Sequence, residues 1–174
     1  MVVTVRAGGY SRARRLLEDF GALGRTEYFN VLVMRISDRQ LFMDVLQARL
    51  GDDPAILDYL ARVVPVEETF LFQHREDFED QARRVAERWL PVLAGRSFHV
   101  RMHRRGFKGR LSSQEEERIL DAALMEALTA RGTPATVSFQ DPDAIIAIET
   151  VGQRAGLSLF TREELQRYTL LDID

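Results

Sequence analysis

The segment AIIAIE (144–149) constrains the fold most, because its apolar side chains fall on both faces of a strand. A strand with two apolar faces lies inside a sheet that is covered on both sides. The segment YFNVLVMRI (28–36) has the same property. Helix-period segments separate the strands, at spacings too irregular for a doubly wound nucleotide-binding sheet. The sequence therefore predicts an α+β fold, an α/β sandwich built on central strands.

Residues 1–75 form the first predicted domain. A short β-rich run precedes a helix that Ser11 is expected to cap and that the following glycines end. The strand at 28–36 is followed by a helix that Asp38 caps and by a second, shorter helix. A β-like run at 63–73 completes the order β-α-β-α-α-β, which is close to a small ferredoxin-like domain.

Residues 76–174 form the second predicted domain. A long amphipathic helix over 76–90 is followed by a strand over 98–103, in which apolar and polar residues alternate. A capping box formed by Ser113 and Glu116 is expected to open the next helix. Three further strands and a short final helix follow, and the sequence QDPD before the strand AIIAIE is typical of a turn.

Several kinds of chemistry have no support in the sequence. The chain has no cysteine, which excludes disulfides, thiolate nucleophiles and cysteine-ligated metal sites. His99 and His103 lie about 13 Å apart on a strand, so they do not share a metal ion. Phosphate-loop, dinucleotide and serine-elbow motifs, a signal peptide and a long apolar run do not occur. We therefore expect a cytoplasmic protein with no catalytic residues, no metal, no cofactor and no membrane contact.

The segment SFHVRMHRRGFKGR (97–110) concentrates positive charge in an acidic chain. Residues 96–110 contain six basic side chains and no acidic one, whereas the other 159 residues hold 18 basic and 27 acidic side chains, a net charge of −9. The only lysine of the chain, Lys108, lies in this segment. Such segregation favours phosphate binding, because basic side chains release counterions from a nucleic-acid backbone.

The expected strand geometry gathers these groups on one surface. His99, Arg101 and His103 project from one face of the strand, and Arg105 extends the row. The glycines of the following loop let its backbone approach a ligand closely. Phe107 is placed to stack on a base, as aromatic side chains do in many RNA-binding proteins.

Two other interpretations of this segment stay open. In the first it is a solvated loop, whose arginines pair with the acidic helix start at Glu115–Glu117 and whose Phe107 packs against the sheet. In the second it contacts another protein. A further basic group surrounds the start of the first helix and is either a polar helix face or part of the same surface: Arg6, Arg12, Arg14 and Arg15.

The second half of the chain resembles the THUMP domain. That family shows an F-x-V-x-x-x-R-R-G strand and loop, a helix, a D-P-D or N-P-D turn and an I-x-I-E strand. The resemblance covers about 61–165, and its segment ARVVPVEETF resembles the I-P-V-E segment of stand-alone members, the Tan-one-like tRNA acetylation adaptors. The first 60 residues match in pattern the ferredoxin-like domain usually found beside THUMP. The motif positions are Phe98, Val100, Arg104, Arg105, Gly106, Asp141, Pro142, Asp143, Ile146, Ile148 and Glu149.

The resemblance implies that the chain binds tRNA at the acceptor stem and the 3′ CCA end. Many THUMP proteins carry a catalytic domain, for which 174 residues leave no room. We therefore expect a non-catalytic adaptor that presents tRNA to a separate tRNA-modifying enzyme, such as a cytidine acetyltransferase. The alternatives are a protein-interaction module without RNA binding, or a small RNA-modifying enzyme with an unrecognised site. The expected RNA contacts are Arg101, His103, Arg104, Arg105, Phe107, Lys108, Arg110 and Arg154.

Overall fold

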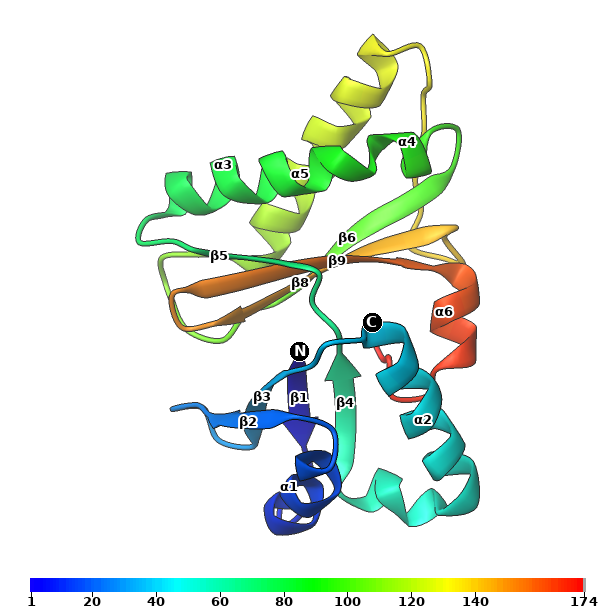
Figure 1. Cartoon of the computed structure of the whole chain (residues 1–174). Coiled ribbons are helices and arrows are strands. Elements are labelled where there is room, and N and C mark those ends of the chain that lie inside the picture. Colours follow the sequence, from blue (N-terminus) through cyan, green and yellow to red (C-terminus); the bar gives the residue numbers. More distant parts are fainter. Residues whose placement is uncertain (174) are drawn as a thin grey trace. The chain divides into compact units, whose positions relative to one another are not determined.

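A computed structural model of the chain describes residues 1–173, which fall into two compact units. The first unit combines residues 1–65 with residues 164–172, and the second unit contains residues 66–163 together with Ile173. Each unit has a sheet of its own (Figure 1). No helix among residues 1–173 is both long enough and apolar enough to cross a membrane.

The first unit is built on a four-stranded antiparallel sheet with the strand order β2-β3-β1-β4. Its chain order, β-α-β followed by β-α-β, is ferredoxin-like, as the sequence predicted, although the predicted order β-α-β-α-α-β lacked one strand. Asp38 caps the second helix as expected, because its side chain accepts a hydrogen bond of 2.9 Å from the Leu41 N–H. The elements are β1 (Val2–Val5), α1 (Tyr10–Glu18), β2 (Ala22–Arg25), β3 (Val31–Arg35), α2 (Arg39–Asp52), the 3-10 helix η1 (Pro54–Asp58) and β4 (Leu60–Val64).

Two local predictions for this unit were wrong. The strand β2 was not predicted, because Gly21 and Gly24 were interpreted as the end of the preceding helix. Helix α1 is capped by Gly9 and not by Ser11. A Cβ atom on Gly9 would lie 2.6 Å from Cβ of Tyr59, so this close approach requires glycine. The contact joins residues far apart in the sequence, and no local pattern reveals it.

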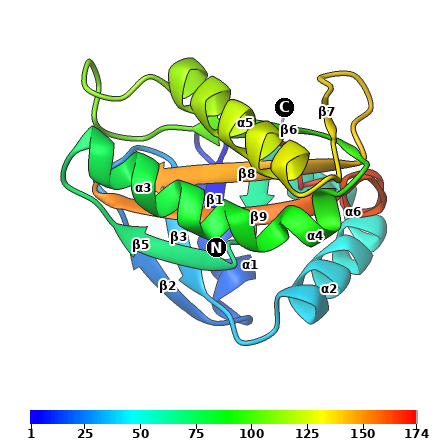
Figure 2. The same cartoon turned by 90° about the horizontal axis from the view of Figure 1, so that it is seen from above.

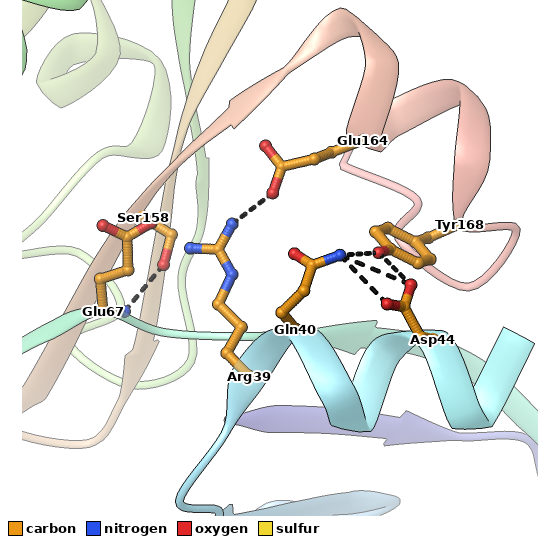
Figure 3. A network of polar contacts seen from close by, with 7 residues as sticks. All are labelled: Arg39, Gln40, Asp44, Glu67, Ser158, Glu164 and Tyr168. Atoms are coloured by element: carbon orange, nitrogen blue, oxygen red, sulfur yellow. Dashed lines mark hydrogen bonds and ion pairs between the residues drawn. The ribbon is translucent and has the colours of Figure 1, made fainter.

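The C-terminal segment completes the first unit by packing against α2. Helix α6 (Arg162–Arg167) supplies Glu164, whose carboxylate accepts a 2.7 Å hydrogen bond from Arg39 (Figure 3). The Tyr168 hydroxyl donates a 2.6 Å hydrogen bond to Asp44 and accepts one of 2.5 Å from Gln40. The Val63 N–H of β4 then donates to the Leu170 carbonyl at 2.8 Å. Residues at the two ends of the chain therefore form one folded unit.

The second unit is built on a five-stranded mixed sheet with the order β5-β9-β8-β6-β7. Strands β5, β9 and β8 pair antiparallel, whereas β6 is parallel to both of its neighbours. Glu67 directly precedes β5 and is bonded to β9, because its N–H donates to the Ser158 hydroxyl at 2.8 Å (Figure 3). The elements are β5 (Glu68–Leu71), α3 (Arg75–Ala86), the 3-10 helix η2 (Glu87–Trp89), α4 (Leu90–Leu93), β6 (Ser97–His103), α5 (Ser113–Ala130), β7 (Thr136–Val137), β8 (Ala144–Val151) and β9 (Arg154–Thr161).

The core of the second unit lies between this sheet and the helices α3 and α5, which lie side by side on it (Figure 2). Phe98, Val100 and Met102 of β6 point into that core, as their alternation predicted. Strand β8 is central and buried on both faces, which confirms the interpretation of AIIAIE. The other face of β6 is less open than expected, because His99 is fully buried and its Nδ1 lies 2.8 Å from the Ser138 carbonyl oxygen.

The capping box of α5 was predicted one residue too late. Ser112 is the N-cap, and its hydroxyl accepts the Glu115 N–H at 3.5 Å. Two adjacent serines before three glutamates fit the pattern in either register, so the sequence does not distinguish them. Glu116, the predicted acidic member of the box, lies inside the unit, with 2% of its surface exposed.

Candidate functional site

A short loop of unusual backbone conformation connects β6 to α5. We call residues 104–111 the cationic loop, because it holds four of the six cations of the basic segment. The φ angles of Gly106, Phe107 and Gly109 are +101°, +52° and +78°. Positive φ is natural for glycine and uncommon for phenylalanine. The chain therefore turns sharply here and directs several side chains toward the start of α5.

A polar hollow of about 410 Å³ lies between the cationic loop and the N-terminal ends of α3 and α5. Its charged lining consists of Arg75, Arg104 and Arg110, with Glu115 as the one acid. Ser113 and Gln114 complete the lining, and they lie in the first turn of α5, at the positive end of an 18-residue helix. Arginine side chains and a helix start are the groups that proteins use to hold phosphate.

The two adjacent arginines of the loop have different environments. Arg104 lines the hollow, and its guanidinium donates to the Gly106 carbonyl oxygen. Arg105 is directed to the sheet, where its guanidinium forms an ion pair and hydrogen bond with Glu149 of β8. Its side chain is 15% exposed, and its backbone N–H donates to the Thr150 hydroxyl at 2.9 Å. Arg105 thus fastens the cationic loop to the sheet, and its predicted RNA contact stays a prediction.

Phe107 packs against the core of the second unit. Its ring centroid lies 4.8 Å from that of Phe72, and the Arg110 guanidinium lies over the same ring, 4.4 Å from its centroid. This packing matches the alternative interpretation of Phe107, in which it packs against the sheet. The aromatic ring also positions Arg110 at the hollow, through a cation–π contact.

The other predicted contacts lie around the loop with different exposure. Lys108 and Arg110 are exposed in the loop, and Arg154 is exposed at the start of β9. Arg101 and His103 are half-buried on β6, and His103 Nδ1 lies 3.7 Å from Glu149. The structure brings Arg104 and Arg110 together at the hollow.

Arg75 is a residue of the hollow that sequence reasoning missed. It is the first residue of α3, and it lies 2.7 Å from Glu79, 3.2 Å from Glu115 and 2.9 Å from Glu116. In the sequence it stands 29 positions before Arg104, in front of a run of acids, so no local signal associates it with the loop. Its positive charge is shared among three carboxylates, which leaves Arg104 and Arg110 as the cations less committed to acidic partners.

Two carboxylates of α5 complete the sheet edge beside the cationic loop. Strand β7 pairs with only Ser97 and Phe98 of β6, so the later N–H groups on that side of β6, opposite β8, have no partner strand. Asp121 accepts the Val100 N–H at 2.9 Å, and Glu117 accepts the Met102 N–H at 2.7 Å. An edge strand covered in this way does not pair with other chains.

Burial raises the pKa of Asp121 to about 7, with a further rise from Glu117 that the Val100 hydrogen bond partly offsets. Between about pH 4 and 7 the folded state therefore holds a proton that the unfolded state has lost. The stability contribution of Asp121 is full below about pH 4 and is lost as pH rises through 7.

We predict that Asp121→Asn flattens this pH dependence. The slope of unfolding free energy between pH 5 and 7 should change by up to about 1.4 kcal/mol per pH unit. Urea denaturation at pH 5, 6, 7 and 8 measures it, with the exposed Asp80→Asn as the control. If the unfolding free energies of wild type and Asp121→Asn changed with pH in parallel, the raised pKa of Asp121 would be contradicted.

Three arginines around α1 have partners within the first unit. Arg6 donates to the Leu57 carbonyl at 2.7 Å, Arg12 lies over the Tyr59 ring, and Arg14 donates to Glu18 at 2.6 Å. These contacts match the interpretation of a polar helix face. Among residues 1–173, no group of three or more histidine, aspartate or glutamate side chains is placed to hold a metal ion.

The comparison with known families decides the identity of the second unit. The THUMP domain profile matches residues 73–159, which is half of the chain. The chain belongs to the THUMP-domain family. The THUMP match includes β6, the cationic loop, α5 and the Asp141–Asp143 turn, in which Asp143 accepts 2.8 Å hydrogen bonds from the N–H and hydroxyl of Ser97.

Solved structures share the fold of this THUMP protein at low sequence identity. They include PH1313 from Pyrococcus horikoshii Ot3 (12% identity, TM-score 0.59) and TrmN from Thermus thermophilus (22% identity, TM-score 0.57). A 4-thiouridine synthetase in complex with RNA and ATP is similar at 15% identity and a TM-score of 0.57. Each comparison covers 91% of this chain, which spans 53%, 43% and 40% of those chains, respectively. A search of curated proteins found no match.

Proposed function

We propose that this THUMP protein binds tRNA through the cationic loop and the adjoining hollow, without catalysing a reaction itself. The observation that carries the proposal is the hollow, where Arg104 and Arg110 face the N-terminal turn of α5. Both groups favour phosphate, and they lie in the unit that matches the THUMP family. The similar 4-thiouridine synthetase is described in complex with RNA, which supports the choice of ligand.

Within this site we assign the residues two roles. Arg104, Lys108 and Arg110 hold phosphates at the loop, and Arg101, His103 and Arg154 contact RNA around it. Arg105 and Phe107 keep the loop in its conformation by anchoring it to Glu149 and Phe72. The acceptor stem and the 3′ CCA end are the part of tRNA that we propose to lie here.

Binding of fluorescent tRNA across a salt series tests this function. With four to six phosphates contacted, log K should fall with log salt at a slope of roughly −3 to −5. The variant Arg104→Glu/Lys108→Glu/Arg110→Glu should lose about 100-fold or more in affinity, and its slope should become shallower by about two to three. Trimming the CCA end should weaken binding to the wild type.

A matched control separates the loop from overall charge. Arg84→Glu/Arg88→Glu/Arg131→Glu makes the same charge change at exposed positions of the same unit, and it should retain most of the affinity. Equal losses in the two triple variants would show that net charge governs binding. Wild type that binds no tRNA at low salt would refute the RNA-binding function.

The adaptor role rests on the resemblance to stand-alone tRNA acetylation adaptors. We propose that the chain presents tRNA to a separate tRNA-modifying enzyme, with a cytidine acetyltransferase as the specific candidate. Adding the protein to such an enzyme with tRNA and acetyl donor should raise the yield of acetylcytidine, measured by nucleoside mass spectrometry. A new nucleoside formed by this protein alone, with common group donors, would identify an enzyme instead.

A further inference from the structure

The second unit has another concave site, a groove of about 130 Å³ between α3 and α5. These helices lie side by side on the sheet (Figure 2), and apolar side chains line the space between them. Phe78 and Ala82 come from α3, and Ile119 and Ala123 come from α5. Ile119 is 42% exposed, although it is a large apolar residue. The groove therefore has apolar walls, and Ile119 exposes part of them to solvent.

Glu116 supplies a buried carboxylate to this groove. Its side chain is 1% exposed, and within residues 1–173 neither of its oxygens accepts a hydrogen bond. Its nearest cation is Arg75, whose Nε lies 2.9 Å from Oε1. That Nε has a single hydrogen, which it donates to Glu79 at 2.7 Å, so its contact with Glu116 is electrostatic only. Burying a carboxylate without a hydrogen bond costs free energy, so a ligand that donates a hydrogen bond to Glu116 would bind favourably.

The charges around Glu116 leave the groove negative. Arg75 is shared with Glu79 and Glu115, so one guanidinium faces three carboxylates. Asp80 also lines the groove, and the remaining cation, Arg83, donates to Glu87 at 2.9 Å. Burial raises the pKa of Glu116 to about 7, and Glu79 and Glu115 raise it further against the opposing effect of Arg75. A bound cation would stabilise the ionised form.

We propose that this groove receives a lysine side chain from a protein partner. The four-carbon stem of lysine would lie on the apolar walls between Ala82 and Ile119, and its ammonium would donate to the Glu116 carboxylate. This pairing follows from charge complementarity, since the groove combines an excess of carboxylates with apolar walls. The inference does not depend on RNA binding, because the groove and the basic hollow have no lining residue in common.

Pentylammonium, which reproduces the lysine side chain with a methyl group in place of Cα, tests the proposal on the full chain. At pH 8 and constant ionic strength, titration with either probe should give a saturable NMR shift of the Ile119 δ-methyl group. The dissociation constant should be at least about fivefold lower for pentylammonium than for pentan-1-ol. The preference should decrease at pH 5.5, where Glu116 is protonated. No saturable shift, or equal affinity for the two probes at pH 8, would overturn the proposal.

Two variants locate the charge that recognises the probe. Glu116→Gln should bind pentylammonium and pentan-1-ol alike, whereas Asp80→Asn, a change at an exposed position, should lower the preference by about twofold. Asp80→Asn keeps the proposal testable if Glu116→Gln does not fold. A full preference for the ammonium retained by either folded variant would contradict it.

Discussion

The double variant Tyr168→Ala/Leu170→Ala is expected to lose most of the stability of the first unit. Both residues are buried, with 3% and 2% exposure, and they lie in the segment that packs beside α2 and β4. Truncation of a large aromatic residue costs about 3–5 kcal/mol, and leucine to alanine about 2–5 kcal/mol. Their sum is comparable with the whole stability of a typical domain, about 5–15 kcal/mol.

Amide hydrogen exchange gives the measurement for that variant. Protection of the amides in β1 and β3 should fall by several orders of magnitude, while β8 keeps its protection. Tyr168→Phe is the matched control, because it removes only the hydroxyl bonded to Asp44 and Gln40 and should cost about 1–2 kcal/mol. Unchanged protection in β1 would show that the first unit folds without the C-terminal segment.

Replacement of Glu149 with alanine should destabilise the second unit by about 3–5 kcal/mol. The change leaves the Arg105 guanidinium, 15% exposed, without its carboxylate partner. Removing one member of a buried pair is costly, since the remaining charge keeps its desolvation penalty. Urea denaturation followed by the fluorescence of Trp89, the only tryptophan, measures the loss.

Arg105→Met/Glu149→Met is the informative comparison for this pair. Replacing both charges with apolar groups of similar length should restore at least half of the stability lost in Glu149→Ala. If the role of Arg105 is structural, the double variant should also bind tRNA with nearly wild-type affinity. A loss below about 1 kcal/mol in Glu149→Ala would contradict a structural role for the pair.

Predictions from periodicity were the most successful ones. The alternation at 98–103 predicted the core face of β6, and the apolar run at 144–149 predicted a central strand. Both patterns arise because the side chains of a strand alternate between its two faces, which needs no knowledge of the rest of the chain. By contrast β2 is four residues long and contains a glycine, so it carries too little pattern to be identified.

The candidate site was less predictable, because its geometry depends on residues distant in the sequence. The charge segregation located the cationic loop, yet Arg104 and Arg105 are indistinguishable by position. Only the pairing of Arg105 with Glu149, 44 residues away, separates a residue that holds the loop from one that lines the hollow. Arg75 joined the hollow for the same reason, since the start of α3 meets the start of α5 only in the folded unit.

The composition of the first unit has a consequence for how the protein is made. A ribosome releases residues 1–65 first, but the partners of Arg39, Gln40 and Asp44 follow only after residues 66–163. At about 5–20 residues per second, the nascent N-terminal sheet waits roughly 5–20 seconds for them. All strands of the second unit have been synthesised once translation reaches Thr161. The second unit can therefore fold before the first unit, although it comes later in the chain.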